Sequence, residues 1–282
     1  MNVSSNIKFK IAPTASVVLS LASAAYRDGI SQTYFENIDH SEGIPLTQAA
    51  LKAYQHTVSV AVFRKRFVRH LFARYATQFP VFQVCILGAG LDPLSLHLLE
   101  RYDDKISYIF EVDRTFMEEK SDMYAKLVGS KHKVQLLTFD VTDTTALLDE
   151  LKLLGLDPKI PTIFLMEGLI YYMSRDKLCS MLEALMTPDQ QRLLIMEYSV
   201  PFEDIPEGDR AGCRNVIRSI EQGTGWPMHL YHRSDIKGLL DFMGCKILTT
   251  DSMKNMEEQL NGKNEIFHQD GEGLIEITSF YI

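Results

Sequence analysis

The sequence predicts an α/β fold in which a mostly parallel sheet is covered by helices on both faces. From Gln83 onward strand-like and helix-like segments alternate, the first strand ends in a Gly-x-Gly turn, and the second strand ends in Asp113. Strands are expected near 83–88, 106–112, 133–139, 160–166, 192–199, 245–250 and 273–281. Helices are expected near 92–101, 114–130, 143–154, 174–187 and 234–243. The last strand is expected to be antiparallel and to lie at the edge of the sheet.

The composition is that of a globular protein organised around one large core. Of the 282 residues, 46% are hydrophobic and 23% are charged. We expect one domain over 1–282, with an N-terminal helical cap at 12–79 and a lid insertion at 200–233 over a core at 80–282. No apolar run reaches the about 18 residues that a membrane span needs, and serines interrupt the apolar stretch near the N-terminus. We therefore expect a cytoplasmic protein.

Charge and cysteine usage narrow the range of partners. A net charge of −8 argues against a nucleic-acid-binding surface, which depends on clustered Lys and Arg. The four cysteines show no Cys-x-x-Cys spacing, so free thiols are expected. The expected partner is a small-molecule substrate, with neither nucleic acid nor membrane involved, and the sequence leaves a homodimer open.

The turn Gly88-Ala89-Gly90 is the strongest local sign of a ligand site. Glycine adopts positive φ and lets a ligand approach the backbone, and the helix that follows offers free N–H groups. Asp113 comes 23 positions after Gly90, close to the ~20-residue spacing at which a carboxylate binds a ribose hydroxyl. A dinucleotide fingerprint needs a third glycine, where this chain has Pro93. An adenosine compound without phosphates is therefore favoured, and S-adenosylmethionine is the commonest cofactor of this kind.

Further polar residues follow the other strands, at the edge where ligands bind in open α/β sheets. Asp140 is placed to accept a hydrogen bond from an adenine amino group, and Val141 to cover the ring. Glu167 would lie beside an ammonium group of the ligand. Each acid alone is equally consistent with a turn or a helix cap.

The long helix expected from about 56 to 79 adds a cationic candidate. Five basic residues punctuate its apolar stripe, and four of them are interpreted as a solvated face. Arg64 is the exception, because it borders the apolar stripe and could reach an anion above the strand ends. The five are Arg64, Lys65, Arg66, Arg69 and Arg74.

Three blocks of the sequence resemble the leucine carboxyl methyltransferase family of S-adenosylmethionine-dependent O-methyltransferases. They are Gly88-Ala89-Gly90-Leu91-Asp92, Phe110-Glu111-Val112-Asp113 and Met166-Glu167-Gly168-Leu169-Ile170-Tyr171-Tyr172-Met173. The resemblance extends over roughly residues 12 to 200. The family also includes bacterial enzymes that methylate polyketide and peptide natural products.

The resemblance implies a class I methyltransferase fold, with a Rossmann-like seven-stranded sheet, an antiparallel last strand and a helical lid. It also implies S-adenosylmethionine as cofactor and S-adenosylhomocysteine as product. The implied cofactor contacts are Arg64 at the carboxylate, Gly88 with Ala89 and Gly90 at the methionine portion, Asp113 at the ribose, Asp140 and Val141 at the adenine, and Glu167 near the amino group.

The chain departs from the family after the glycine turn. Relatives often continue with Asp-Thr-Arg and a further arginine, whereas this chain reads Asp92-Pro93-Leu94-Ser95-Leu96-His97. The missing arginines indicate that the surface above this helix is rebuilt. We therefore expect methyl transfer to a hydroxyl or carboxyl oxygen of a small molecule, such as a polyketide or peptide natural product.

Three residues are candidates for proton transfer at the acceptor. Alignment of the nucleophile supplies much of the rate of methyl transfer, and a carboxylate acceptor needs no base. A hydroxyl acceptor usually needs one, and the catalytic candidates are His229, His232 and Tyr171, although each is also consistent with a structural role. His229-x-x-His232 matches half a metal site, but no third ligand is evident, so no metal is predicted.

Three other functions remain open from the sequence. The chain is also compatible with a carboxyl methyltransferase that acts on a protein C-terminus. An NAD-dependent oxidoreductase would share the glycine turn and Asp113, but Pro93 and the lack of a Tyr-x-x-x-Lys pair argue against it. A non-catalytic S-adenosylmethionine-binding module would keep the cofactor residues, and only turnover would separate it from an enzyme.

Overall fold

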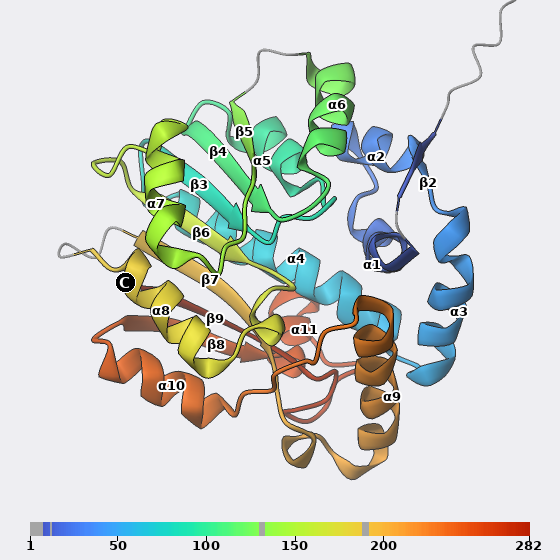
Figure 1. Ribbon diagram of the computed structural model, residues 1–282. Coiled ribbons are helices and arrows are strands. Elements are labelled where there is room, and N and C mark those ends of the chain that lie inside the picture. The colour runs from blue at the N-terminus through green and yellow to red at the C-terminus, as the bar shows by residue number, and fades with distance from the viewer. Residues whose placement is uncertain (1–7, 12, 130–132, 188–191) are drawn as a thin grey trace, which may run out of the picture.

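The computed structural model describes residues 8–11, 13–129, 133–187 and 192–282 and shows the predicted α/β fold. Its main sheet has the order β5-β4-β3-β6-β7-β9-β8 (Figure 1). The strands are β3 (Phe82–Leu87), β4 (Ile106–Asp113), β5 (Val134–Thr138), β6 (Thr162–Met166), β7 (Arg192–Ser199), β8 (Lys246–Ser252) and β9 (Ile275–Tyr281). The first five are parallel, and β9 is antiparallel to β7 and β8. All seven predicted strands and the antiparallel last strand are confirmed.

The prediction that the last strand lies at the sheet edge is wrong. β9 lies between β7 and β8, and Ile277 is in register with Glu197 on one side and Asp251 on the other. Six of its seven residues are buried, as suits an inner strand. The edge strand β8 carries the polar sequence KILTTDS and is only partly buried, which suits a strand with one free side.

Helices cover both faces of the sheet. The helices are α1 (Pro13–Ala22), α2 (Gly29–Glu36), α3 (Ile44–Ala53), α4 (Thr57–Ala76), α5 (Leu94–Tyr102), α6 (Met117–Val128), α7 (Thr144–Leu153), α8 (Arg175–Leu185), α9 (Glu207–Thr224), α10 (Arg233–Phe242) and α11 (Met253–Asn261). Every helix predicted between 92 and 243 is present. Residue 130, where one of them was expected to end, and residues 1–7 lie outside the described residues.

Two helices beyond residue 200 were not predicted. The expected lid 200–233 contains α9, and the connection expected to run between the last two strands without a helix contains α11. Figure 1 shows α1, α2, α3 and α9 along one side of the sheet. The Tyr54 hydroxyl donates a hydrogen bond to Asp209 Oδ2 at 2.8 Å, which joins the cap to α9. None of the described helices is long and apolar enough to cross a membrane.

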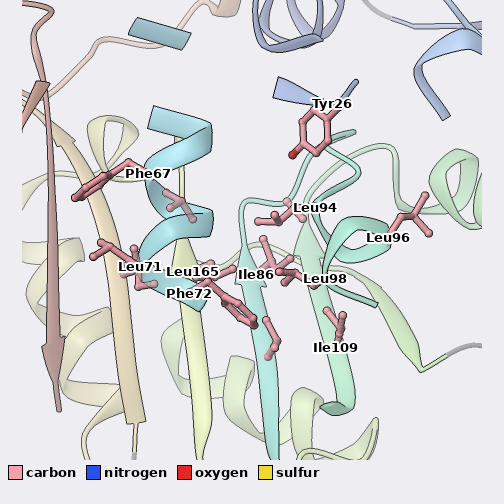
Figure 2. Packing of buried hydrophobic residues seen from close by; sticks show 14 of the residues in the cluster. Tyr26, Phe67, Leu71, Phe72, Ile86, Leu94, Leu96, Leu98, Ile109 and Leu165 are labelled. Carbon is pink, nitrogen blue, oxygen red and sulfur yellow. The ribbon is translucent and has the colours of Figure 1, made fainter. Parts of the chain in front are cut away.

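The core lies in two layers because alternate residues of each inner strand face opposite helices. In β3, Ile86 belongs to the layer under α4, whereas Leu87 belongs to the layer under α7, α8 and α10. Figure 2 shows Phe72 of α4 directed at Ile86 and Leu165. This packing fixes α4 across the sheet, so the first turns of α4 supply side chains to the functional site described below.

Candidate functional site

The glycine turn after β3 has a backbone conformation that favours glycine. Gly88 has φ +72° and Gly90 has φ +47°, a region that L side chains rarely occupy. A Cβ at Gly88 would lie 3.1 Å from the Leu169 side chain, whereas no described atom outside the adjoining residues lies within 4 Å of a Cβ at Gly90. The Gly88 and Ala89 amides donate to the Val112 carbonyl at 2.9 and 3.1 Å. The turn is therefore tied to the end of β4 and leaves room beside Gly90.

Asp113 lies directly against this turn. Its Oδ2 accepts a hydrogen bond from the Gly90 amide at 2.9 Å, and its Oδ1 accepts from the Thr115 amide and hydroxyl at 3.1 and 3.2 Å. The spacing between Gly90 and Asp113 thus reflects a direct contact. Binding of a ribose by Asp113 stays a prediction.

Asp140 and Val141 follow β5, on the far side of Asp113. Asp140 Oδ1 accepts from the Thr142 amide and hydroxyl at 2.9 and 2.8 Å, and these bonds lower the pKa of Asp140 although its partial burial opposes ionisation. Arg114 Nη1 lies 3.7 Å from Asp140 Oδ2. The Val141 side chain is buried in the layer under α7 and α8.

A residue of the segment expected to form a lid, Trp226, contacts Arg114 at this end of the site. The guanidinium carbon of Arg114 lies 5.0 Å from the centre of the Trp226 indole, which is a cation–π contact. Trp226 stands just after the end of α9, and half of its surface is exposed. The segment that follows α9 therefore meets the part of the strand edge that carries Asp140.

A buried lysine that the sequence did not single out joins two acids of the site. Lys65 Nζ lies 2.9 Å from Asp92 Oδ2 and 2.9 Å from Glu167 Oε2. The Lys65 and Glu167 side chains are 7% and 8% exposed. The prediction that Lys65 belongs to a solvated helix face is wrong. Its position three residues before buried Val68 and seven before buried Phe72 was a signal that it faces inward.

A second buried ion pair lies beside the first. Arg64 Nε donates to Glu197 Oε2 at 2.7 Å, and the Tyr171 hydroxyl donates to Glu197 Oε1 at 2.5 Å. A Cβ on Gly168 would lie 3.7 Å from Arg64 Nη2, so the terminal nitrogens of Arg64 are directed at Gly168. Burial and the Glu197 carboxylate raise the pKa of Tyr171 well above its usual value, although the Arg64 charge opposes them. Tyr171 therefore holds its proton at neutral pH and is suited to orienting its neighbours.

The two candidate histidines lie in different surroundings. The His229 amide donates to the Tyr171 carbonyl at 2.7 Å, which places the backbone of His229 beside that of Tyr171. His232 Nδ1 lies 2.8 Å from Asp204 Oδ2, and its side chain is 41% exposed. The hydrogen bond to Asp204 raises the pKa of His232.

Two cavities lie outside the strand ends that carry the glycine turn. One, of about 160 Å³, adjoins the His232 and Asp204 pair and is lined by Val200, Asp204, Arg233, Asp270, Gly271 and Glu276. Another, of about 350 Å³, lies between α6 and β5 and is lined by Met117, Glu118, Ser121, Ala125, Val134, Gln135, Leu136 and Thr138. Neither is lined by a predicted site residue. Within the ranges described, no group of three or more His, Cys, Asp or Glu is arranged to hold a metal ion.

Residues 14–186 match the family model described as leucine carboxyl methyltransferase. The chain belongs to this family. It is an S-adenosylmethionine-dependent methyltransferase, as the resemblance of its three sequence blocks implied. Among curated proteins, no sequence matches this chain.

Two solved structures share the fold of this leucine carboxyl methyltransferase family member. One is a protein from Thermobifida fusca YX, provisionally described as a methyltransferase, with a TM-score of 0.69 and 15% identity, covering 99% of this chain and 96% of that one. The other is a DUF574 family protein from Streptomyces avermitilis MA-4680, with a TM-score of 0.68 and 13% identity, covering 96% and 97%. At these identities the likeness establishes the class I methyltransferase fold.

The residues of this methyltransferase fit S-adenosylmethionine. The turn at Gly88 and Gly90 provides close backbone approach, and Asp113 provides a carboxylate beside it. Glu167 Oε2 is buried and, apart from its contact with Lys65, accepts no hydrogen bond from a described residue. A buried acid of this kind suits the ammonium of a cofactor with an amino-acid portion.

Proposed function

We propose that this methyltransferase transfers the methyl group of S-adenosylmethionine to a hydroxyl or carboxyl oxygen of a small molecule, with polyketide or peptide natural products as the acceptor class. Family membership supports an oxygen acceptor. The N-terminal helices cover the start of α5, and this observation supports the choice of a small acceptor.

Three hydrogen bonds fasten this cover. The Tyr34 hydroxyl donates to the Leu91 carbonyl at 2.9 Å, the Ile30 amide donates to Glu100 Oε1 at 2.7 Å, and the Tyr26 hydroxyl donates to Asp92. The segment 93–97, where relatives carry arginines, lies next to these contacts. A covered site favours an acceptor small enough to fit entirely inside it. The cover therefore argues against the C-terminus of a folded protein as the acceptor.

The roles proposed for the cofactor residues follow from their contacts. Arg64 keeps Nε on Glu197, so its terminal nitrogens remain for the cofactor carboxylate. Bound S-adenosylmethionine supplies a methyl group on a positively charged sulfur. The chain orients the cofactor around that group with Asp113 toward the ribose, Asp140 and Val141 toward the adenine, and Glu167 toward the ammonium. Such alignment removes much of the entropic part of the barrier.

Proton removal is needed only for a hydroxyl acceptor. Tyr171 holds its own proton and donates a hydrogen bond to Glu197, so we assign it a positioning role. His229, whose backbone is bound to Tyr171, and His232, which is paired with Asp204, are the residues proposed to take up a proton.

Calorimetric titration with S-adenosylmethionine, S-adenosylhomocysteine and NAD tests the cofactor site. We expect both adenosyl compounds to bind and NAD not to bind. Asp113→Ala should weaken binding of the adenosyl compounds by about 1–3 kcal/mol, the scale for loss of a charge-assisted hydrogen bond. Asp122→Ala, which removes an exposed aspartate on α6, is the matched control and should leave both affinities unchanged.

Two results would change the assignment. Binding of NAD alone would favour an oxidoreductase, and unchanged affinity in folded Asp113→Ala would remove the ribose role. Turnover then distinguishes an enzyme from a non-catalytic binding module. The measurement is S-adenosylhomocysteine formation with small hydroxyl and carboxyl acceptors and with peptides that end in a free leucine carboxylate.

A further inference from the structure

A buried tyrosine of the N-terminal cap contacts the loop that carries the glycine turn. Tyr26 directly follows the short helical turn Ser23–Ala25, is 3% exposed, and donates a hydrogen bond from its hydroxyl to Asp92 Oδ1. Burial and the Asp92 carboxylate raise the pKa of Tyr26 well above its usual value, although the Arg69 charge opposes them. The hydroxyl therefore keeps its proton and acts toward Asp92 as a donor.

The ring of Tyr26 is held by contacts that do not involve its hydroxyl. The guanidinium carbon of Arg69 lies 3.8 Å from the ring centre, and Arg69 Nη1 donates to the Ala25 carbonyl at 2.5 Å. The Phe35 ring lies 5.1 Å from the Tyr26 ring, centre to centre, and the His97 ring stands nearly perpendicular to it at 6.2 Å. Removal of the hydroxyl alone should therefore leave the ring packed and the cap docked.

Asp92 connects Tyr26 to Glu167 through a lysine. Asp92 Oδ2 lies 2.9 Å from Lys65 Nζ, which also lies 2.9 Å from Glu167 Oε2. Burial opposes ionisation of Asp92, but Lys65 and the Tyr26 hydroxyl together hold its pKa below the usual value. Lys65 thus occupies Oε2 of Glu167 and leaves Oε1 as the oxygen that can face a ligand. We call these four residues the Tyr26 relay.

We propose that Tyr26 is a positioning residue that orients the Glu167 carboxylate toward the ammonium of the cofactor's amino-acid portion. It acts through Asp92 and Lys65 and needs no contact of its own with the cofactor. The proposal rests on the role of Glu167 in the proposed function. Without the hydroxyl, the Asp92 carboxylate can turn and draw Lys65 away from Glu167. A carboxylate that is not held in one orientation binds an ammonium less tightly, because binding must then order it.

Only the part of the cofactor that meets Glu167 should respond to the Tyr26 relay. S-adenosylhomocysteine carries the ammonium, whereas 5′-methylthioadenosine has the same adenine, ribose and thioether and lacks the amino-acid portion. A general loosening of the cap or of the glycine turn would weaken binding of both ligands. Loss of the relay should weaken binding of the first ligand alone, so the comparison separates positioning from a merely structural role.

The test is calorimetric titration of both ligands into the native protein and into Tyr26→Phe. We expect this variant to bind S-adenosylhomocysteine about fivefold more weakly, the scale of coupling through side-chain networks, and to bind methylthioadenosine as the native protein does. Tyr34→Phe is the matched control. It removes a hydroxyl that donates to the Leu91 carbonyl at 2.9 Å and lies outside the relay, so it should change both affinities by the same factor.

A second variant breaks the relay one step further on. Asp92→Asn removes the charge that holds Lys65, and it should also weaken binding of S-adenosylhomocysteine while sparing methylthioadenosine. In the Asp92→Asn background the link is already lost, so Tyr26→Phe should cause no further weakening. Thermal unfolding of the ligand-free variants shows that each is folded at the temperature of the titration.

The outcomes separate this proposal from the proposed function. Unchanged affinity of Tyr26→Phe for S-adenosylhomocysteine, equal weakening of both ligands, or an equally large effect in the Asp92→Asn background would overturn the proposal and leave the cofactor site intact. Failure of both ligands to bind the native protein would overturn the proposed function, and this inference with it.

Discussion

His97 shows how the environment of a single residue makes stability depend on pH. Its side chain is 8% exposed on α5, and Arg101 Nη1 lies 3.1 Å from its Nδ1. Burial first, and then the charges of Arg69 and Arg101, lower the pKa of His97 to about 3. The unfolded chain has a histidine pKa of about 6.5. The neutral ring therefore contributes stability fully above about pH 6.5, and this contribution is lost as the pH falls toward 3.

The variant His97→Gln should remove this dependence and keep an acceptor for Arg101. Between pH 7 and pH 4 we expect the free energy of unfolding of the native protein to fall by about 2–3 kcal/mol more than that of His97→Gln. Denaturant unfolding at both pH values measures the difference. His268→Gln, at an exposed position, should behave as the native protein does. Identical pH dependence in native protein and His97→Gln would contradict the argument.

At the residue scale, the sequence predicts those contacts that follow from chain geometry. Gly90 and Asp113 meet because adjacent parallel strands bring their carboxyl ends together. The spacing of the two residues in the sequence was therefore sufficient to predict their contact. The contact between Lys65 and Asp92 depends on how α4 crosses the sheet, and no local pattern encodes that crossing. Glu197 was missed because it lies within β7, not at its end, and its charge is matched only through tertiary contact with Arg64.

The segment after α9 carries a tryptophan whose fluorescence can report ligand binding. Trp226 is the only tryptophan of the chain, and the Arg114 guanidinium lies 5.0 Å from its ring centre. Arg114 also lies 3.7 Å from Asp140, the residue predicted to bind the adenine. A ligand that binds there should change the field and the solvent around the indole.

We expect saturating S-adenosylhomocysteine to change the intensity or wavelength of Trp226 emission, with the same dissociation constant as calorimetry gives. Arg114→Ala should reduce the change, because the indole loses its cationic partner. Arg218→Ala, at an exposed position on α9, is the control. An unchanged emission spectrum at full occupancy would show that this segment does not meet the adenine end of the site.

At the element scale, three glycines of the expected lid do not interrupt a helix. Gly208, Gly212 and Gly223 all lie within α9. A Cβ on Gly212 would lie 2.8 Å from the Tyr54 ring and 3.1 Å from the Ala53 carbonyl, so glycine allows the end of α3 to approach α9. Glu207 and Asp209 in the first turn were the available signal, because acids favour a helix N-terminus.

At the scale of the whole molecule, strand identity was more predictable than strand order. Apolar runs identify strands locally, whereas the order depends on where each crossover returns. The insertion of β9 between β7 and β8 reflects burial of both of its sides. The two-layer core followed from the continuous apolar character of β3 and β6, which is typical of strands covered on both faces.

A buried ion pair connects sheet, helix and glycine turn across the molecule. Lys120 of α6 pairs with Glu111 of β4, and both side chains are 0% exposed. Lys120 Nζ also donates to the Gly90 carbonyl at 2.9 Å, and the Tyr124 hydroxyl donates to Glu111 Oε1 at 3.0 Å. The same lysine therefore balances a buried acid and holds the backbone of the predicted cofactor turn.

These two roles can be separated by mutation. Lys120→Met should lower the free energy of unfolding by about 3–5 kcal/mol, because it leaves Glu111 buried and without its cation. Adding Glu111→Gln removes the unmatched charge and keeps an acceptor for Tyr124, so the double variant should recover most of the loss in denaturant unfolding. Its affinity for S-adenosylmethionine should stay reduced, because the Gly90 carbonyl still lacks its donor. Recovery of stability and affinity together would mean that Lys120 acts on the turn only through the charge of Glu111.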